Sequence, residues 1–315
     1  MAQVAATPTG SDNLKGMALM IAAVLAVPSL DAIAKFLGAS MSPLQIAFIR
    51  YCVQTVILFT VLTALRRQIA TPAVVAALPR LTFMGALMAG SVATLFISLL
   101  YLPLANAIAI FFVAPLILTG FGVVFLGERV GWHRRAALAV GLFGTLVVLR
   151  PNVTEFGWAA VLPLFSAAGF AGVLTVLRSM RGSLDPLRTQ AVSGAFATAF
   201  LGVGCALGIA SGVPVLALTM PTGQEWILLL LLGSLATFFQ FLFTLAVRLA
   251  EASLLAPFQY LEIFAATVLG YVIFDEWPDA LTFCGTAIIL AAGLYVFHRE
   301  RRLGLMAEKA KPRVP

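Results

Sequence analysis

The chain has 315 residues, of which 61% are hydrophobic and only 10% are charged, and its mean hydropathy is +1.03. Soluble globular proteins carry about 25% charged residues, and disordered chains combine low hydrophobicity with high charge, so both classes are excluded. The net charge of +7 comes from basic residues between apolar runs, which indicates orientation in a membrane and excludes nucleic-acid binding as the reason for the charge.

The apolar runs predict ten membrane-spanning helices joined by short connections. A bilayer span needs about 20 predominantly apolar residues. The first run contains Asp31 and Lys35 and has no small-residue cleavage pattern after it, so we expect a retained span and not a signal peptide. The expected spans are 16–37, 43–65, 81–101, 104–126, 132–149, 158–177, 187–209, 225–247, 252–274 and 279–297.

The basic residues are distributed unevenly between the two sets of connections. With the N-terminus placed in the cytoplasm, 17 of the 20 Lys and Arg residues fall in cytoplasmic segments, Arg150 lies outside, and Lys35 and Arg50 lie within spans. The positive-inside rule therefore predicts that both termini are cytoplasmic and that the number of spans is even.

The two halves of the chain share a pattern at the end of the fourth and ninth spans. Gly122 lies six residues before Glu128, Gly270 lies six residues before Glu276, and each stretch contains a proline. Each unit contains five spans, and an odd number forces the second unit to insert upside down. We therefore expect a cytoplasmic tail at 1–15, a five-helix repeat at 16–150, a second at 158–298 and a basic cytoplasmic tail at 299–315.

Further motifs lie at the two ends of the chain. Asp31-x-x-x-Lys35 is followed by Gln45 and Arg50, and the last span ends in Gly293-Leu294-Tyr295 before the basic tail. Together with the stretches 115–128 and 257–276, these motifs resemble the drug/metabolite transporter superfamily, in its ten-helix, two-repeat EamA branch. The resemblance implies an all-α polytopic carrier in the cytoplasmic (inner) membrane of a bacterium. The branch includes importers of riboflavin and S-adenosylmethionine and exporters of amino acids and metallophores, so no single substrate is implied.

Four charged residues stand out inside the predicted spans, away from their ends, where charges are costly and are usually paired or functional. Asp31 and Lys35 share one helix face, so they either pair with each other or handle substrate or protons. Arg50 is expected to pair with Asp31 or to meet an anionic group of the substrate. Glu262 is the best candidate for proton coupling because it lies near the middle of its span; the alternative is a permanent ion pair with Arg50 or Lys35.

Neutral polar residues complete the candidate binding site. Asn106, Gln240, Gln259 and Tyr260 lie in predicted spans, and apolar walls with a few polar groups are typical of a small-molecule pocket. The three cysteines and two histidines show no metal-ligand spacing, so we expect neither a metal nor a cofactor.

These features predict a secondary transporter that moves a small organic metabolite by alternating access, driven by protons or a counter-substrate. Riboflavin uptake is the first substrate hypothesis, and export of an amino-acid-like metabolite or a metallophore is the alternative. The chain has no Walker A motif, so ATP is not the direct driving force. A channel or a membrane-embedded enzyme is the alternative from another class, although the chain contains neither H-E-x-x-H nor G-x-S-x-G.

Overall fold

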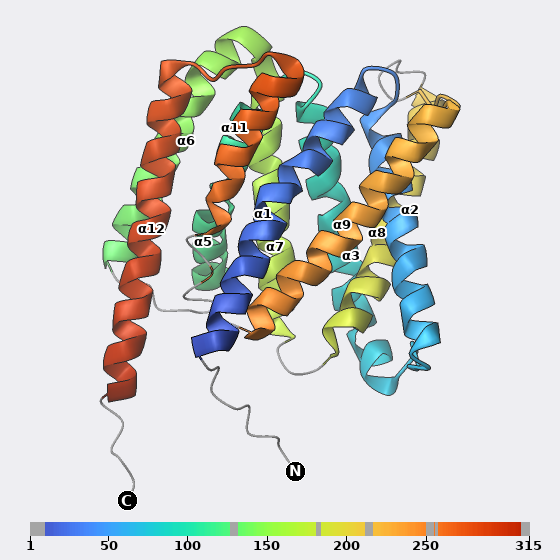
Figure 1. The fold of residues 1–315 in the computed structure, drawn as a ribbon, viewed down its shortest axis with the longest axis horizontal. Helices are drawn as coiled ribbons and strands as arrows, with labels where there is room; N and C mark the ends of the chain where they lie inside the picture. Colours follow the sequence, from blue (N-terminus) through green and yellow to red (C-terminus); the bar gives the residue numbers. More distant parts are fainter. Residues whose placement is uncertain are drawn as a thin grey trace, which may run out of the picture.

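The computed structural model describes residues 10–126, 132–180, 184–211, 217–249, 255 and 258–309. These residues form a helical bundle (Figure 1). Within them, seven helices are long and apolar enough to cross a membrane, and shorter apolar helices cover Ala136–Leu149, Leu261–Phe274 and Ala280–Tyr295. The prediction of an all-α polytopic membrane protein is confirmed.

The two halves of the bundle run in opposite directions. α1 leads away from the end of the bundle where the chain termini lie, whereas α7 leads back toward that end (Figure 1). The first half contains α1 (Gly10–Gly38), α2 (Pro43–Ala64), α3 (Pro72–Ser98), α4 (Leu104–Phe111), α5 (Ala114–Leu126) and α6 (Trp132–Phe156). The second contains η1 (Gly157–Val161), α7 (Leu162–Ser179), α8 (Pro186–Ser211), α9 (Gly223–Leu249), α11 (Leu261–Phe274) and α12 (Ala280–Lys309).

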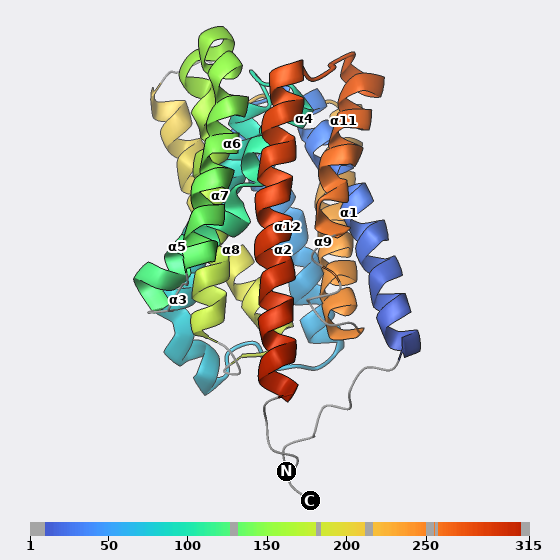
Figure 2. The same ribbon diagram turned by 90° about the vertical axis from the view of Figure 1, so that its left-hand side faces the viewer.

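The halves pack against each other in a reciprocal way. α1 of the first half packs on α9 and α11 of the second, and α7 of the second packs on α3 and α5 of the first. α2 pairs with α8, and α6 pairs with α12 at one side of the bundle (Figure 2). This pattern is the one expected of two inverted five-helix repeats related by an approximate two-fold axis.

The start of each repeat aligns with an offset of 143 residues. Pro43 begins α2 and Pro186 begins α8, where the missing N–H of proline costs nothing. Lys35 is in the last turn of α1 and Arg178 is in the last turn of α7, each eight residues before that proline. The turns from α1 to α2 and from α7 to α8 therefore share a basic residue followed, eight positions later, by a proline.

The third helix of each repeat aligns with an offset of 148 residues. A Cβ atom at Gly85 of α3 would lie 2.8 Å from the carbonyl oxygen of Ser193, and one at Gly233 of α9 would lie 3.0 Å from that of Arg50. Ser193 and Arg50 are themselves related by the offset of 143. Both glycines thus allow the same close approach between equivalent helix pairs, which supports the register between the repeats.

The predicted fourth span, 104–126, is divided in the middle of the bundle. α4 ends at Phe111 and α5 begins at Ala114. Pro115 has no N–H to donate, and its ring clashes with the carbonyl of the residue four positions earlier, which is Phe111. Pro28 and Pro79, in contrast, lie inside α1 and α3 without ending them.

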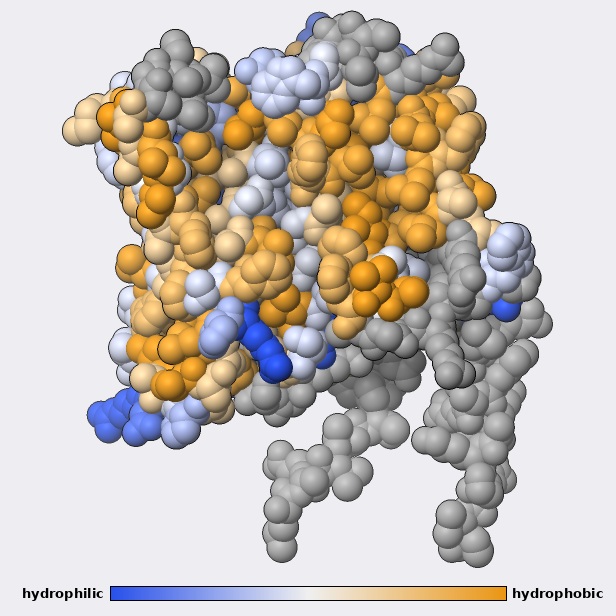
Figure 3. Space-filling model, turned by 180° about the vertical axis from the view of Figure 1, so that it is seen from behind, coloured by the Kyte–Doolittle hydropathy of each residue, from blue (hydrophilic) through white to orange (hydrophobic). Residues whose placement is uncertain are grey.

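The outer surface of the bundle is predominantly apolar. Phe83, Phe125 and Val272 expose more than half of their surface. Figure 3 shows hydrophobic residues over most of the described part of one face, with strongly hydrophilic residues at its lower edge. A surface of this kind is suited to lipid and not to water.

Candidate functional site

Three of the predicted charged residues come together inside the bundle from three different helices. Asp31 of α1 is 7% exposed, and Glu262 lies in the first turn of α11. The charge of Arg50 on α2 acts on Asp31, and the charge of Asp31 acts on Glu262. Because α1 and α2 belong to one repeat and α11 to the other, this group lies at the repeat interface.

Direct contacts with the described residues do not neutralise this group. Neither the Asp31 nor the Glu262 carboxylate forms a hydrogen bond or an ion pair with another described residue. Arg50 Nη1 is buried without a hydrogen-bond partner there, and its guanidinium lies 4.9 Å from the ring centre of Tyr51. The predicted alternatives of a direct Asp31–Arg50 pair and of a permanent Glu262 pair are therefore not formed in this structure.

Unpaired charges at such a place are unfavourable, and the cost is relieved when a carboxylate binds a proton or when a ligand supplies a partner. Buried charges are normally paired, because leaving one unpaired costs several kcal/mol. A bound solute with polar or charged groups would supply the missing partners for Asp31, Arg50 and Glu262. The three residues therefore offer two acceptor groups and one donor group to a ligand at the repeat interface.

Lys35 does not pair with Asp31, although the two share a helix face. Its Nζ lies 2.5 Å and 2.8 Å from the two carboxylate oxygens of Glu276 and donates to the carbonyl of Leu102 at 2.8 Å. Lys35 is one turn nearer the helix end than Asp31, and a lysine stem at a helix end extends its ammonium group away from the apolar interior. The ion pair therefore joins α1 to the connection after α11, across the two repeats.

The turn after α11 places Glu276 where it meets Lys35. Asp275 adopts the left-handed conformation with φ 56°, and the N–H of Glu276 bonds to the carbonyl of Gly270. This bond spans one residue more than the 6→1 bond of a Schellman turn, but the left-handed residue ends the helix in the same manner. The Glu276 carboxylate also accepts a 3.0 Å hydrogen bond from the backbone N–H of Leu104, the first residue of α4, and so stabilises the positive end of that helix.

The neutral candidates are divided between the interior and the surface. Tyr260 precedes α11, and its ring centre lies 5.6 Å from that of Phe112 at the break between α4 and α5. Asn106 is buried on α4, and Gln259 is half-buried beside Tyr260. The side chain of Gln240 is exposed on α9, so it lies outside this interior group.

The role of Glu276 is the main feature that the sequence did not reveal. The repeat pattern singled it out together with Glu128, but only as a residue at a helix end. Glu128 lies outside the described residues. Lys35 and Glu276 are 241 positions apart, and no local pattern predicts that two such residues meet.

Known proteins with similar sequences are membrane transporters. The profile of the EamA-like transporter family matches residues 14–150 and 157–297. A riboflavin transporter of Rhizobium johnstonii is 32% identical over 200 residues, which are 64% of each chain and so just under two thirds of that relative. An S-adenosylmethionine uptake transporter of Rickettsia felis is 25% identical over 92% of this chain and 94% of its own.

Two further similarities extend over nearly the whole chain. The pseudopaline exporter CntI of Pseudomonas aeruginosa is 26% identical over 89% of this chain and 95% of its own. One protein of known crystal structure superposes with a TM-score of 0.59 at 20% identity, covering 93% of this chain and 98% of the other. At that identity the structural likeness shows the fold alone.

Proposed function

The chain belongs to the EamA-like transporter family, and on this premise we propose that it is a secondary transporter that moves a small organic metabolite across a bacterial cytoplasmic membrane. In the proposed orientation both termini are cytoplasmic. Inverted repeats exchange their conformations during alternating access, which exposes an interfacial site first to one side and then to the other.

The observation that carries the proposal is the unneutralised group of Asp31, Arg50 and Glu262. Ionisable residues inside a membrane protein are typical of substrate and proton pathways. The group lies between helices of both repeats, where a rocking motion would change its surroundings. We propose that it forms the substrate and coupling site.

Riboflavin is the first proposed substrate, taken up into the cell. Its ring system has a planar aromatic face and an edge with carbonyl acceptors and an N–H donor. Arg50 would donate to the carbonyls, a carboxylate of Asp31 or Glu262 would accept from the N–H, and Tyr260 with Phe112 would cover the ring face. The 32% identical relative named as a riboflavin transporter supports this choice.

The alternative is an amino-acid-like metabolite, including export of a metallophore. A zwitterion would place its carboxylate on Arg50 and its cationic group between Asp31 and Glu262, which uses all three charges of the site. The relatives named for S-adenosylmethionine uptake and pseudopaline export support this second candidate.

The ion pair between Lys35 and Glu276 gives the proposed cycle a gate. It holds the end of α1, the start of α4 and the connection after α11 together at the end of the bundle opposite the chain termini. In the proposed orientation this is the outer side. We propose that the pair is formed while the outer side is closed and breaks when that side opens.

Growth of a riboflavin-auxotrophic bacterium on limiting riboflavin tests the function and the first substrate together. Expression of the wild-type chain is expected to restore growth, and Asp31→Asn or Glu262→Gln is expected to abolish it at equal membrane expression. Asp185→Asn is the matched control, because Asp185 pairs with Arg67 on the surface. Absence of growth with the wild type excludes riboflavin uptake. Saturable exchange of S-adenosylmethionine or an amino acid in proteoliposomes would then support the alternative, and absence of saturable flux would contradict the transporter proposal for these solutes.

A further inference from the structure

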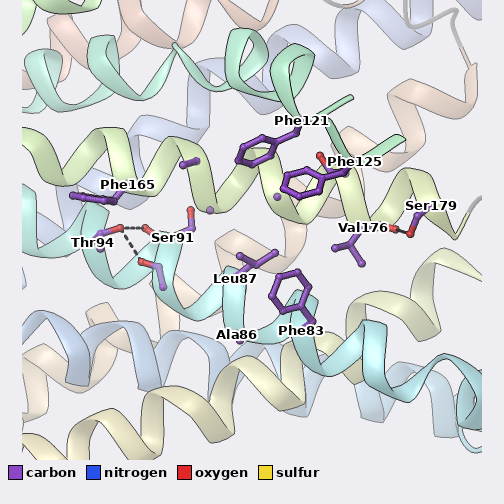
Figure 4. Close-up of a pocket in the computed structure, with 15 residues that line it drawn as sticks. Phe83, Ala86, Leu87, Ser91, Thr94, Phe121, Phe125, Phe165, Val176 and Ser179 are labelled. Carbon is purple, nitrogen blue, oxygen red and sulfur yellow. Dashed lines mark hydrogen bonds between the residues drawn. The ribbon is translucent and has the colours of Figure 1, made fainter. Parts of the chain in front are cut away.

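A groove of about 680 Å³ lies outside the charged site, on the side of the bundle formed by α3, α5 and α7 (Figure 4). Both α3 and α5 pack on α7, so α7 forms the floor and the other two helices form the walls. Gly169 and Gly172 of α7 line the groove where α3 packs closely on α7, because a Cβ atom at either would lie 3.0 Å from Ser91 or Leu87. Phe83 on one wall and Phe125 on the other are 58% and 67% exposed, so the groove opens toward the surrounding bilayer.

The groove offers carbon and not polar atoms to an occupant. Ser91 donates to the carbonyl of Ser166 at 2.9 Å, and Thr94 donates to that of Gly90 at 2.8 Å. The hydroxyls of Thr175 and Ser179 likewise donate to carbonyls of their own helix. Because these hydroxyl groups already have acceptors, the lining favours a hydrocarbon chain and provides no specific contact for a polar solute.

The corresponding positions of the other repeat carry two phenylalanines, of which Phe238 is 52% exposed and Phe239 is half-buried. With the offset of 148, Gly90 and Ser91 of α3 correspond to Phe238 and Phe239 of α9. The two phenyl rings have centres 5.9 Å apart, and Phe239 packs against the core. One repeat thus supplies aromatic carbon at the positions where the other leaves a space, which indicates an apolar occupant for that space.

The length and the charge of the groove specify the kind of occupant. Its lining runs along α7 from Phe165 to Ser179, and 14 residues of helix rise about 21 Å. Half of the hydrocarbon core of a bilayer is about 15 Å thick, so the groove is long enough for an acyl chain of one leaflet. Arg80 is exposed on α3 three residues before Phe83, on the same helix face as the groove. A positive charge therefore stands at the end of the groove where a lipid headgroup would lie.

We propose that this groove binds one acyl chain of an anionic phospholipid, with the phosphate group of the lipid held at Arg80. The lipid belongs to the leaflet next to the start of α3. Anionic headgroups are attracted to basic residues at a membrane surface, and the apolar lining accepts the chain. The assignment does not depend on the transported solute, because the groove shares no residue with the group of Asp31, Arg50 and Glu262.

A substitution at Gly90 would fill the groove from α3. A Cβ atom at Gly90 would meet no atom within 4 Å, so Gly90→Phe introduces the residue that α9 has at the equivalent position. Gly120→Phe is the matched control, because Gly120 on α5 also has open space but does not line the groove. Gly90→Leu is a smaller second variant should the phenyl ring prevent folding.

The test is native mass spectrometry of the full chain in detergent with equimolar phosphatidylglycerol and phosphatidylethanolamine of identical acyl chains. The wild type and Gly120→Phe are expected to retain one phosphatidylglycerol with roughly a fivefold preference over phosphatidylethanolamine. Gly90→Phe is expected to lower the occupancy of phosphatidylglycerol at least about tenfold. Arg80→Gln is expected to retain one lipid but to lose the preference for phosphatidylglycerol over phosphatidylethanolamine. Wild-type lipid retention by both Gly90→Phe and Gly90→Leu overturns the groove assignment, and an unchanged preference in Arg80→Gln overturns the headgroup contact.

Discussion

The two repeats have the same scaffold but not the same chemistry. α1 contains Asp31, α11 contains Glu262 and α2 contains Arg50. At the positions related by the repeat offsets, α7 has Leu174, α8 has Ser193 and α5 has Ala114. The glycines that allow close helix packing are duplicated, whereas the charges of Asp31, Arg50 and Glu262 are not.

This difference separates what the fold needs from what a solute needs. Close approach between helices is required in both repeats, because both must pack in the same way, so Gly85 and Gly233 are both retained. In the proposed cycle a solute needs one set of charged partners, and a second set would add only the cost of burying charge. The apolar groove at α3, α5 and α7 occupies the side of the pseudo-symmetric pair that carries no charge.

The largest expected effect comes from comparing equivalent positions of α1 and α7. Asp31→Ala removes a charge of the site and is expected to lower the rate of solute uptake at least about tenfold, which corresponds to about 1.4 kcal/mol. Leu174→Ala at the equivalent position removes only apolar contact and is expected to retain uptake within about twofold. Initial rates of solute uptake in cells with equal membrane expression of the two variants test this prediction. Equal losses of uptake in Asp31→Ala and Leu174→Ala would place the site elsewhere.

The charge at the start of α11 is expected to affect energy coupling more than exchange. Glu262→Gln keeps the shape of the side chain but binds no proton, so a pH gradient should no longer drive solute accumulation. Exchange of labelled for unlabelled solute, which needs no net proton movement, should continue. Both are measured in proteoliposomes with and without a pH gradient, and accumulation that persists in Glu262→Gln removes this residue from coupling.

The ion pair across the repeats is expected to contribute more to stability than a surface pair. The side chains of Lys35 and Glu276 are 13% and 25% exposed, and a double-mutant cycle with Lys35→Ala and Glu276→Ala should give a coupling of about 1–3 kcal/mol. The pair of Arg67 and Asp185, whose arginine is 47% exposed, should give less than about 1 kcal/mol.

Thermal unfolding in detergent measures both couplings of these ion pairs. The exchanged pair Lys35→Glu with Glu276→Lys should recover part of the stability lost by either single change. However, it should not recover all of it, because Glu276 also accepts a hydrogen bond from the N–H of Leu104. Equal coupling energies for the two ion pairs would contradict the prediction that the less exposed pair, Lys35 with Glu276, contributes more to stability.

The duplicated glycines are expected to respond alike. Gly85→Ala and Gly233→Ala each place a Cβ within 3.0 Å of a backbone carbonyl of the neighbouring helix, so each should cost about 1–3 kcal/mol of stability. Thermal unfolding of the two variants side by side tests the inverted register. A loss confined to one of them would contradict the equivalence of the helix pairs α3–α8 and α9–α2.

The smallest expected effect is at Gly90, whose Cβ direction is open. Gly90→Ala adds a good helix former to α3 without a clash, so the apparent Tm should stay constant or rise by the equivalent of about 0.5–1 kcal/mol. The comparison with Gly85→Ala, at the close-packed glycine of the same helix, separates the effect of available space from that of helix propensity. A large loss at Gly90 would mean that the groove is narrower than described.

The sequence by itself determined the membrane class, the all-α architecture and the relation between the two halves. Apolar run length fixes a helix in lipid, because every backbone group there must be satisfied within its own segment. The sequence also singled out Asp31, Arg50 and Glu262, because a charged residue within an apolar run can be recognised without knowledge of the fold.

Only the tertiary structure decided which residues meet. The i,i+4 spacing left open a pair of Asp31 with Lys35, but the turn at Asp275 brings Glu276 to Lys35 from 241 residues away. The groove at Gly90 was equally invisible, because a single glycine in a chain with 26 of them predicts no cavity. Pairing and empty space depend on distances between helices, and these distances are set by packing across the repeat interface and not by local sequence.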